Sequence, residues 1–66
     1  MNEEELQRLR KSIHDLNNTV GVILTSSELL QLEQLGSKAL ERAHLIEVKA
    51  LAVREILRDL SDHYFR

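Results

Sequence analysis

Apolar residues recur along the first half of the chain at heptad spacing. Seven aliphatic residues and one serine are separated alternately by three and four positions: Leu6, Leu9, Ile13, Leu16, Val20, Ile23, Ser27 and Leu30. This alternation keeps the apolar positions on one stripe of an α-helix and is typical of helices that pack lengthwise. It predicts a helix over about residues 3–35. Asn2 is its expected N-cap, and Glu5 follows three residues later as in a capping box.

A second stripe with the same alternation runs through the other half of the chain: Ala39, Ala43, Ile46, Ala50, Val53, Leu57, Leu60 and Tyr64. It predicts a helix over about residues 38–64. Gly36 and Ser37 form the turn signal between the two. We expect Gly36 to end the first helix in a left-handed conformation and Ser37 to cap the second. A turn this short makes the two helices antiparallel neighbours.

The composition fits helices and limits the size of the core. The chain has 66 residues, no proline, no cysteine and two glycines, so it forms one domain over residues 1–66 without disulfides. A single hairpin of this length cannot cover two apolar stripes, and small domains often gain the missing core by oligomerisation. We therefore predict an all-α fold in which the hairpin forms a homodimeric four-helix bundle.

Charge and hydropathy narrow the classes of partner. The net charge of −2 gives no basic surface for nucleic acid. No apolar run approaches the roughly 20 residues that a bilayer crossing needs, so we expect no membrane insertion. The acidic start of the chain is unlike a signal peptide. A cytoplasmic protein is expected.

His14 is the residue best suited to chemistry. It lies beside the apolar stripe, so its ring should be accessible, and Asn18 shares its face one turn later. A histidine that accepts a phosphoryl group needs one exposed neutral nitrogen and a partner that holds the other. Asp15 is the candidate partner, and Asn18 is a candidate for orienting water or a phosphoryl oxygen. The alternative is that His14 is an ordinary solvated histidine.

Other residues near His14 suggest a docking surface. Gly21 and Thr25 continue the face of Asn18 with small side chains. Arg54 or Arg58 should lie at a similar height on the second helix, where a guanidinium group can bind phosphoryl oxygens. Alternatively, both are surface charges that pair with Glu55 or Asp59. We assign no role to the other two histidines, His44 and His63, and no metal site, because the spacing of His14 and Asp15 matches no known ligand pattern.

The run His14-Asp15-Leu16-Asn17-Asn18, with the apolar positions that continue to Leu24, resembles a known motif. It is similar to the phosphoacceptor motif of the dimerisation and histidine-phosphotransfer (DHp, HisKA-like) domain of bacterial sensor histidine kinases. The family fold is an antiparallel hairpin that dimerises into a four-helix bundle. The resemblance implies that His14 is phosphorylated, that Asp15 assists as acid or base, and that Asn18 is the polar residue of a phosphatase motif.

The resemblance also implies partners. A response-regulator receiver domain would dock beside the histidine, on a surface that includes Asn17, Gly21, Val22 and Thr25. This sequence has Thr19 where many members carry proline, and it has no nucleotide-binding box. ATP and Mg would therefore act only through a separate histidine-kinase ATP-binding domain, and the chain itself would bind no cofactor.

Two functions from different classes follow from these patterns. In the first, the chain is part of a histidine kinase or a stand-alone phosphotransfer protein, and His14 passes its phosphoryl group to a receiver domain. In the second, it is a non-catalytic dimeric adaptor or inhibitor that binds a kinase or a receiver domain.

Overall fold

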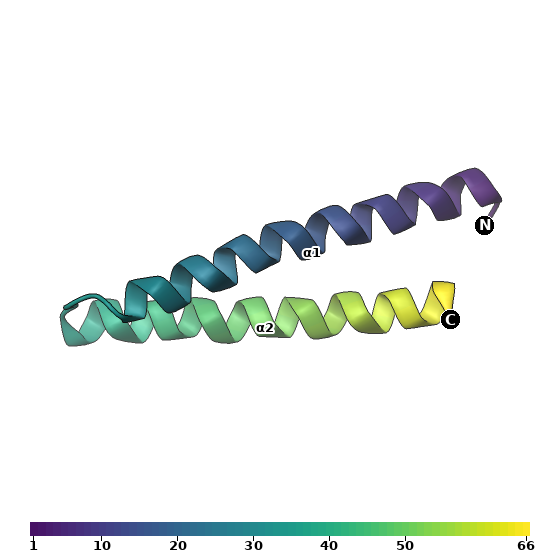
Figure 1. The fold of residues 1–66 in the computed structure, drawn as a ribbon. Coiled ribbons are helices and arrows are strands. Elements are labelled where there is room, and N and C mark those ends of the chain that lie inside the picture. Colours follow the sequence, from purple (N-terminus) through teal and green to yellow (C-terminus); the bar gives the residue numbers. More distant parts are fainter.

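The chain folds into two long helices that lie against each other in opposite directions (Figure 1). The computed structural model describes all residues, 1–66. Helix α1 spans Glu3–Gln31 and helix α2 spans Ser37–Phe65. The molecule is a rod of 50 × 15 × 14 Å, with both termini at one end and the connection at the other. The predicted all-α hairpin is confirmed.

The start of α1 follows the capping pattern in the sequence. The Asn2 side-chain oxygen accepts a hydrogen bond from the Glu5 backbone N–H at 2.8 Å. The return bond differs from a standard capping box, because the Asn2 side-chain amide donates to the Glu5 carboxylate at 3.1 Å. Three consecutive glutamates, beginning at Glu3, also place negative charge at the positive end of the helix dipole.

The connection between the helices corrects the predicted boundaries. Helix α1 ends at Gln31, four residues before the expected position 35. Its last turn tightens, because the backbone N–H groups of Leu32 and Glu33 donate to carbonyls three residues earlier at 3.1 Å. The chain then reverses over residues 32–36. Residues 32–35 have good helix propensity, but they leave the helix in this reversal, and Leu35 becomes half-buried there. The burial gained in the reversed chain therefore outweighs the local preference for helix.

Gly36 and Ser37 do not act as predicted. No residue in the chain has positive φ, so Gly36 does not end α1 in a left-handed conformation. Gly36 is instead the N-cap of α2, with φ −64° and ψ 161°, an extended conformation open to any residue. Ser37 is the first helical residue rather than the cap, and α2 has no side-chain capping bond. It ends at Phe65, one residue beyond the predicted 64.

The core between the helices uses every second position of each apolar stripe. The buried residues of α1 are Ile13, Val20, Leu24 and Ser27, and those of α2 are Ala43, Ala50 and Leu57. Apart from Leu24, the buried residues of each helix are seven apart, which is one heptad. Ser27 is accommodated because its hydroxyl donates to the Leu24 carbonyl at 2.7 Å. Small residues at 43 and 50 let the backbones approach closely.

Five of the ten remaining stripe positions carry branched aliphatic side chains that are exposed in the hairpin. We call the surface that they form the apolar face, and it consists of Leu16, Ile23, Leu30, Ile46 and Val53. Each of these side chains is 37–48% exposed. Neither helix combines the length and apolar content that a bilayer crossing requires.

Candidate functional site

His14 lies on the flank of α1, in the half of the helix that precedes Val20. Its neighbour Ile13 is buried against α2, whereas His14 itself is exposed. At about 100° per residue, one step along the helix turns a side chain from the core towards solvent. The heptad stripe therefore fixes the backbone of His14 and leaves its ring accessible, as the sequence predicted.

Asn18 makes the direct contact with the His14 ring. The amide nitrogen of Asn18 lies 3.3 Å from His14 Nε2. The two residues are four apart on a helix, so their side chains are neighbours on one face. Because an amide N–H can only donate, this contact is a hydrogen bond when Nε2 carries no proton.

Asp15 is directed elsewhere. Its carboxylate accepts a hydrogen bond from the Lys11 ammonium at 3.0 Å, in an exposed ion pair one turn apart. Its backbone carbonyl accepts a hydrogen bond from the Thr19 hydroxyl at 2.9 Å. The structure therefore joins His14 to Asn18, not to Asp15.

A shallow furrow begins at Asn18 and extends along α1 away from His14. We call it the polar furrow. It is lined by Asn17, Asn18, Gly21, Val22, Thr25, Ser26 and Arg54. All four residues named from the sequence as partner-binding lie in it. A Cβ atom added at Gly21 would meet nothing within 4 Å, so packing within the hairpin does not require the glycine.

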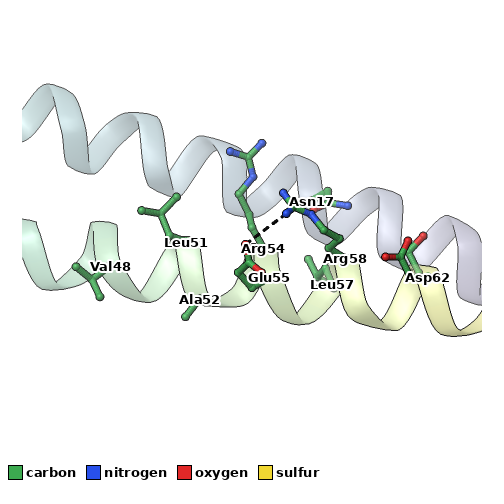
Figure 2. Close-up of a pocket in the computed structure, with 10 residues that line it drawn as sticks. Asn17, Val48, Leu51, Ala52, Arg54, Glu55, Leu57, Arg58 and Asp62 are labelled. Carbon is green, nitrogen blue, oxygen red and sulfur yellow. Dashed lines mark hydrogen bonds and ion pairs between the residues drawn. The ribbon is translucent and has the colours of Figure 1, made fainter.

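The two arginines of α2 differ in their pairing. Arg58 lies 3.4 Å from the Glu55 carboxylate, whereas Arg54 has no carboxylate within 4.0 Å. Both line a second groove with Asn17, and Figure 2 shows both extending from α2 towards α1. Arg54 also lines the polar furrow, so it is an unpaired cation shared by the polar furrow and the second groove.

Ser26 is the furrow residue that sequence reasoning missed. It lies four residues after Val22, and that spacing would have placed the two on adjoining parts of the helix surface. A contact between the helices near the turn was missed as well. Gln31 donates to the Glu47 carboxylate at 3.5 Å, and the same carboxylate lies 3.3 Å from His44 Nδ1.

This arrangement can perform the chemistry of an accessible imidazole. The ring has an amide donor at one nitrogen, hydrogen-bonding groups one to three turns away and a free guanidinium group beside them. No group of three or more histidine, cysteine, aspartate or glutamate side chains is placed to hold a metal ion. The His14 ring itself is suited to nucleophilic attack or proton transfer.

Comparison with known proteins gives no match for this chain, whether to a family model, a curated protein or a solved structure.

Proposed function

We propose that this chain is a phosphoacceptor and dimerisation domain of two-component signalling, in which His14 accepts a phosphoryl group and passes it to a receiver domain. The observation that supports this most directly is the contact between Asn18 and His14 Nε2, at 3.3 Å on an exposed helix flank. A solvated surface histidine needs no such partner. The resemblance of residues 14–18 to the DHp motif points to the same chemistry.

The proposed transfer uses the Nε2 lone pair of His14. This pair attacks the phosphorus of an acyl phosphate or phosphoanhydride, forming an N–P bond. The P–O bond to the leaving group breaks, and that oxygen keeps the bonding electrons. In the second half-reaction a carboxylate of the receiver domain attacks phosphorus, the N–P bond breaks and the pair returns to Nε2. Once the Asn18 amide moves away from Nε2, the exposed ring lets the donor and the acceptor approach in line in turn.

Dimerisation is the second part of the proposal. Only 7 of the 66 residues are buried in the hairpin, which is a small core for independent stability. The apolar face repeats at heptad spacing on both helices. A two-fold axis would bring this face against its copy, since heptad stripes pack as knobs into holes. The resulting four-helix bundle would leave His14 on its outside.

Docking of the receiver domain would use the polar furrow. Its floor at Gly21 and Thr25 has small side chains, so another surface can approach α1 closely. Arg54 has no carboxylate of its own, and receiver domains act through aspartate side chains. A charge-assisted hydrogen bond from Arg54 to an acidic partner group would therefore favour association beside His14.

The experiment that tests the proposal is transfer of radiolabelled phosphate. The chain is incubated with receiver domains labelled by acetyl phosphate and, separately, with the ATP-binding domains of histidine kinases and labelled ATP. We expect label that is lost in acid and stable in base, as for phosphohistidine. His14→Ala should abolish it, while His44→Ala and His63→Ala should retain it. Label that persists on His14→Ala would overturn the assignment.

The adaptor function makes a different prediction in the same experiment. The exposed apolar face supports it, because an apolar surface of this kind also suits binding without chemistry. An adaptor or inhibitor would bind a kinase or a receiver domain equally well with His14→Ala and would acquire no label. Binding measured alongside labelling therefore separates the two functions.

A further inference from the structure

The hydrogen bond between Asn18 and His14 has a consequence for the protonation of the ring. A neutral imidazole carries one proton, either on Nδ1 or on Nε2, and the other nitrogen is an acceptor. The Asn18 amide nitrogen is 3.3 Å from Nε2 and can only donate. This contact is favourable only when Nε2 has no proton. Asn18 therefore favours the ring form that carries its proton on Nδ1.

We infer that Asn18 is a positioning residue that selects the Nδ1–H tautomer of His14 and so prepares Nε2 as the nucleophile. The tautomer is a property of this chain alone, but its value for phosphoryl transfer rests on the function proposed above. With the proton already on Nδ1, attack by Nε2 on phosphorus requires no prior proton shift. A ring with its proton on Nε2 would first have to tautomerise, because that nitrogen would have no in-plane lone pair.

Asp15 does not supply this selection in the free hairpin. A carboxylate beside Nδ1 would favour the same tautomer by accepting its proton. The Asp15 carboxylate is held by Lys11 at 3.0 Å, one turn towards the N-terminus. Of the hydrogen bonds in the structure, the one from Asn18 is the single bond that reaches the His14 ring.

The same contact also covers the nucleophilic atom. The Asn18 amide occupies the approach to Nε2, so it must swing aside before a phosphorus atom can reach the lone pair. Asn18 is exposed, so its side chain can rotate into solvent. Once displaced, its amide is free to donate to a phosphoryl oxygen instead.

The other two histidines provide internal references. His44 Nδ1 lies 3.3 Å from the Glu47 carboxylate, which accepts but cannot donate, so this ring is also expected to carry its proton on Nδ1. His63 has an edge contact with the Tyr64 ring at 4.7 Å and no hydrogen bond. Its ring should show the preference of free histidine, which favours the proton on Nε2.

The test is nitrogen NMR of the full-length chain, uniformly labelled with ¹⁵N, at about pH 9, where an ordinary histidine is neutral. The Nδ1 and Nε2 chemical shifts report the tautomer ratio of each ring, and His44→Gln and His63→Gln assign the signals. An exposed hydrogen bond should shift the His14 ratio by roughly two- to tenfold towards Nδ1–H relative to His63.

Two substitutions at position 18 should move the ratio in different ways. Asn18→Ala removes the donor, so the His14 ratio should fall to that of His63. Asn18→Asp replaces the donor with an ionised acceptor, so the ring should turn to the Nε2–H form. Asn17→Ala is the matched control, since Asn17 makes no hydrogen bond to the ring, and it should leave the ratio unchanged.

A His14 ratio equal to that of His63 in the unmodified chain would overturn the inference, as would equal ratios in Asn18→Ala and Asn18→Asp. These outcomes are separate from the fate of the proposed function. Phosphate labelling of His14 without a tautomer bias would leave the function and remove this inference. A tautomer bias that changes with the Asn18 substitutions as described, in a chain that accepts no labelled phosphate, would support this inference and remove the proposed function.

Discussion

The apolar face and the polar furrow lie on opposite sides of the same two helices. Counted from the buried Val20 at about 100° per residue, Ile23 lies ~60° to one side and Gly21 ~100° to the other. On one side every layer presents a branched aliphatic side chain. On the other, the same length of α1 presents amides, hydroxyls and a glycine, with Arg54 from α2 beside them. Gly21 and Ile23, two positions apart on α1, thus belong to two chemically distinct surfaces.

The difference shows which surface suits which kind of partner. The apolar face has heptad spacing but no hydrogen-bonding specificity, so it suits a permanent contact with a symmetric copy. The polar furrow is lined mainly by polar residues and contains one unpaired charge, so it suits a contact that forms and dissociates. A phosphotransfer domain needs both at once: a stable scaffold and an accessible histidine.

The largest effect should come from a charge on the apolar face. Ile23 is 45% exposed in the single hairpin, so Ile23→Glu places no charge in its core, but it would bury an unpaired carboxylate in the proposed dimer, on which the small hairpin core depends for stability. An uncompensated buried charge costs on the order of 3–5 kcal/mol, and the dimer would contain two. We expect a monomeric mass by sedimentation at micromolar concentration, with loss of helicity by circular dichroism.

Val22→Glu is the control for that change. Val22 is adjacent in sequence, equally apolar and 66% exposed, but it lies in the polar furrow. The dimer mass should be unchanged in this variant. Equal dissociation by both substitutions would show that the apolar face is not the dimer contact.

The next effect should come from the core that joins the two surfaces. Leu57→Ala removes a side chain that is 4% exposed and belongs to the cluster with Val20, Leu24 and Ala50. Loss of a buried leucine typically lowers the free energy of unfolding by about 2–5 kcal/mol. Urea denaturation measures the change. Leu45→Ala, at a position that is 55% exposed, should lower the free energy of unfolding far less. Equal decreases for the two variants would mean that the dimer buries Leu45 as deeply as Leu57.

Arg54→Gln should have a smaller effect, confined to the furrow. It removes the one furrow cation and leaves the apolar face untouched, so stability and dimer mass should not change. Association with an acidic receiver surface should weaken by roughly three- to tenfold, with reduced dependence on salt, as is usual for a peripheral charge. Phosphotransfer rates measured at several salt concentrations test this. Lys49 is an exposed cation of α2 that lines neither the polar furrow nor the second groove, so Lys49→Gln should not alter the rate.

The sequence was sufficient for the hairpin and for the position of Asn18 beside His14, but not for the turn or for the pairing of Asp15. Heptad spacing and the Asn2 cap are local signals, and both gave the correct helices. Residues 32–35 are good helix formers without a stop signal, so their exit from the helix depends on packing of the second helix, which no local pattern records. The pairing of Asp15 with Lys11 rather than the ring likewise depends on competition between partners. Spacing alone allowed both.

The smallest effect on stability should come from Gly21→Ala, which distinguishes a packing role of Gly21 from a docking role. A glycine inside a helix costs about 1 kcal/mol relative to alanine, and a Cβ here would meet nothing within 4 Å. Gly21→Ala should therefore raise the free energy of unfolding by up to ~1 kcal/mol in urea denaturation. The same methyl group would project into the polar furrow and slow the proposed transfer to a receiver domain. Gly36→Ser, which supplies the side-chain cap that α2 lacks, should stabilise the chain without slowing transfer. If Gly21→Ala is more stable and transfers phosphate at the same rate, the polar furrow is not the docking surface. The apolar face would then be the only one of the two surfaces with an assigned partner.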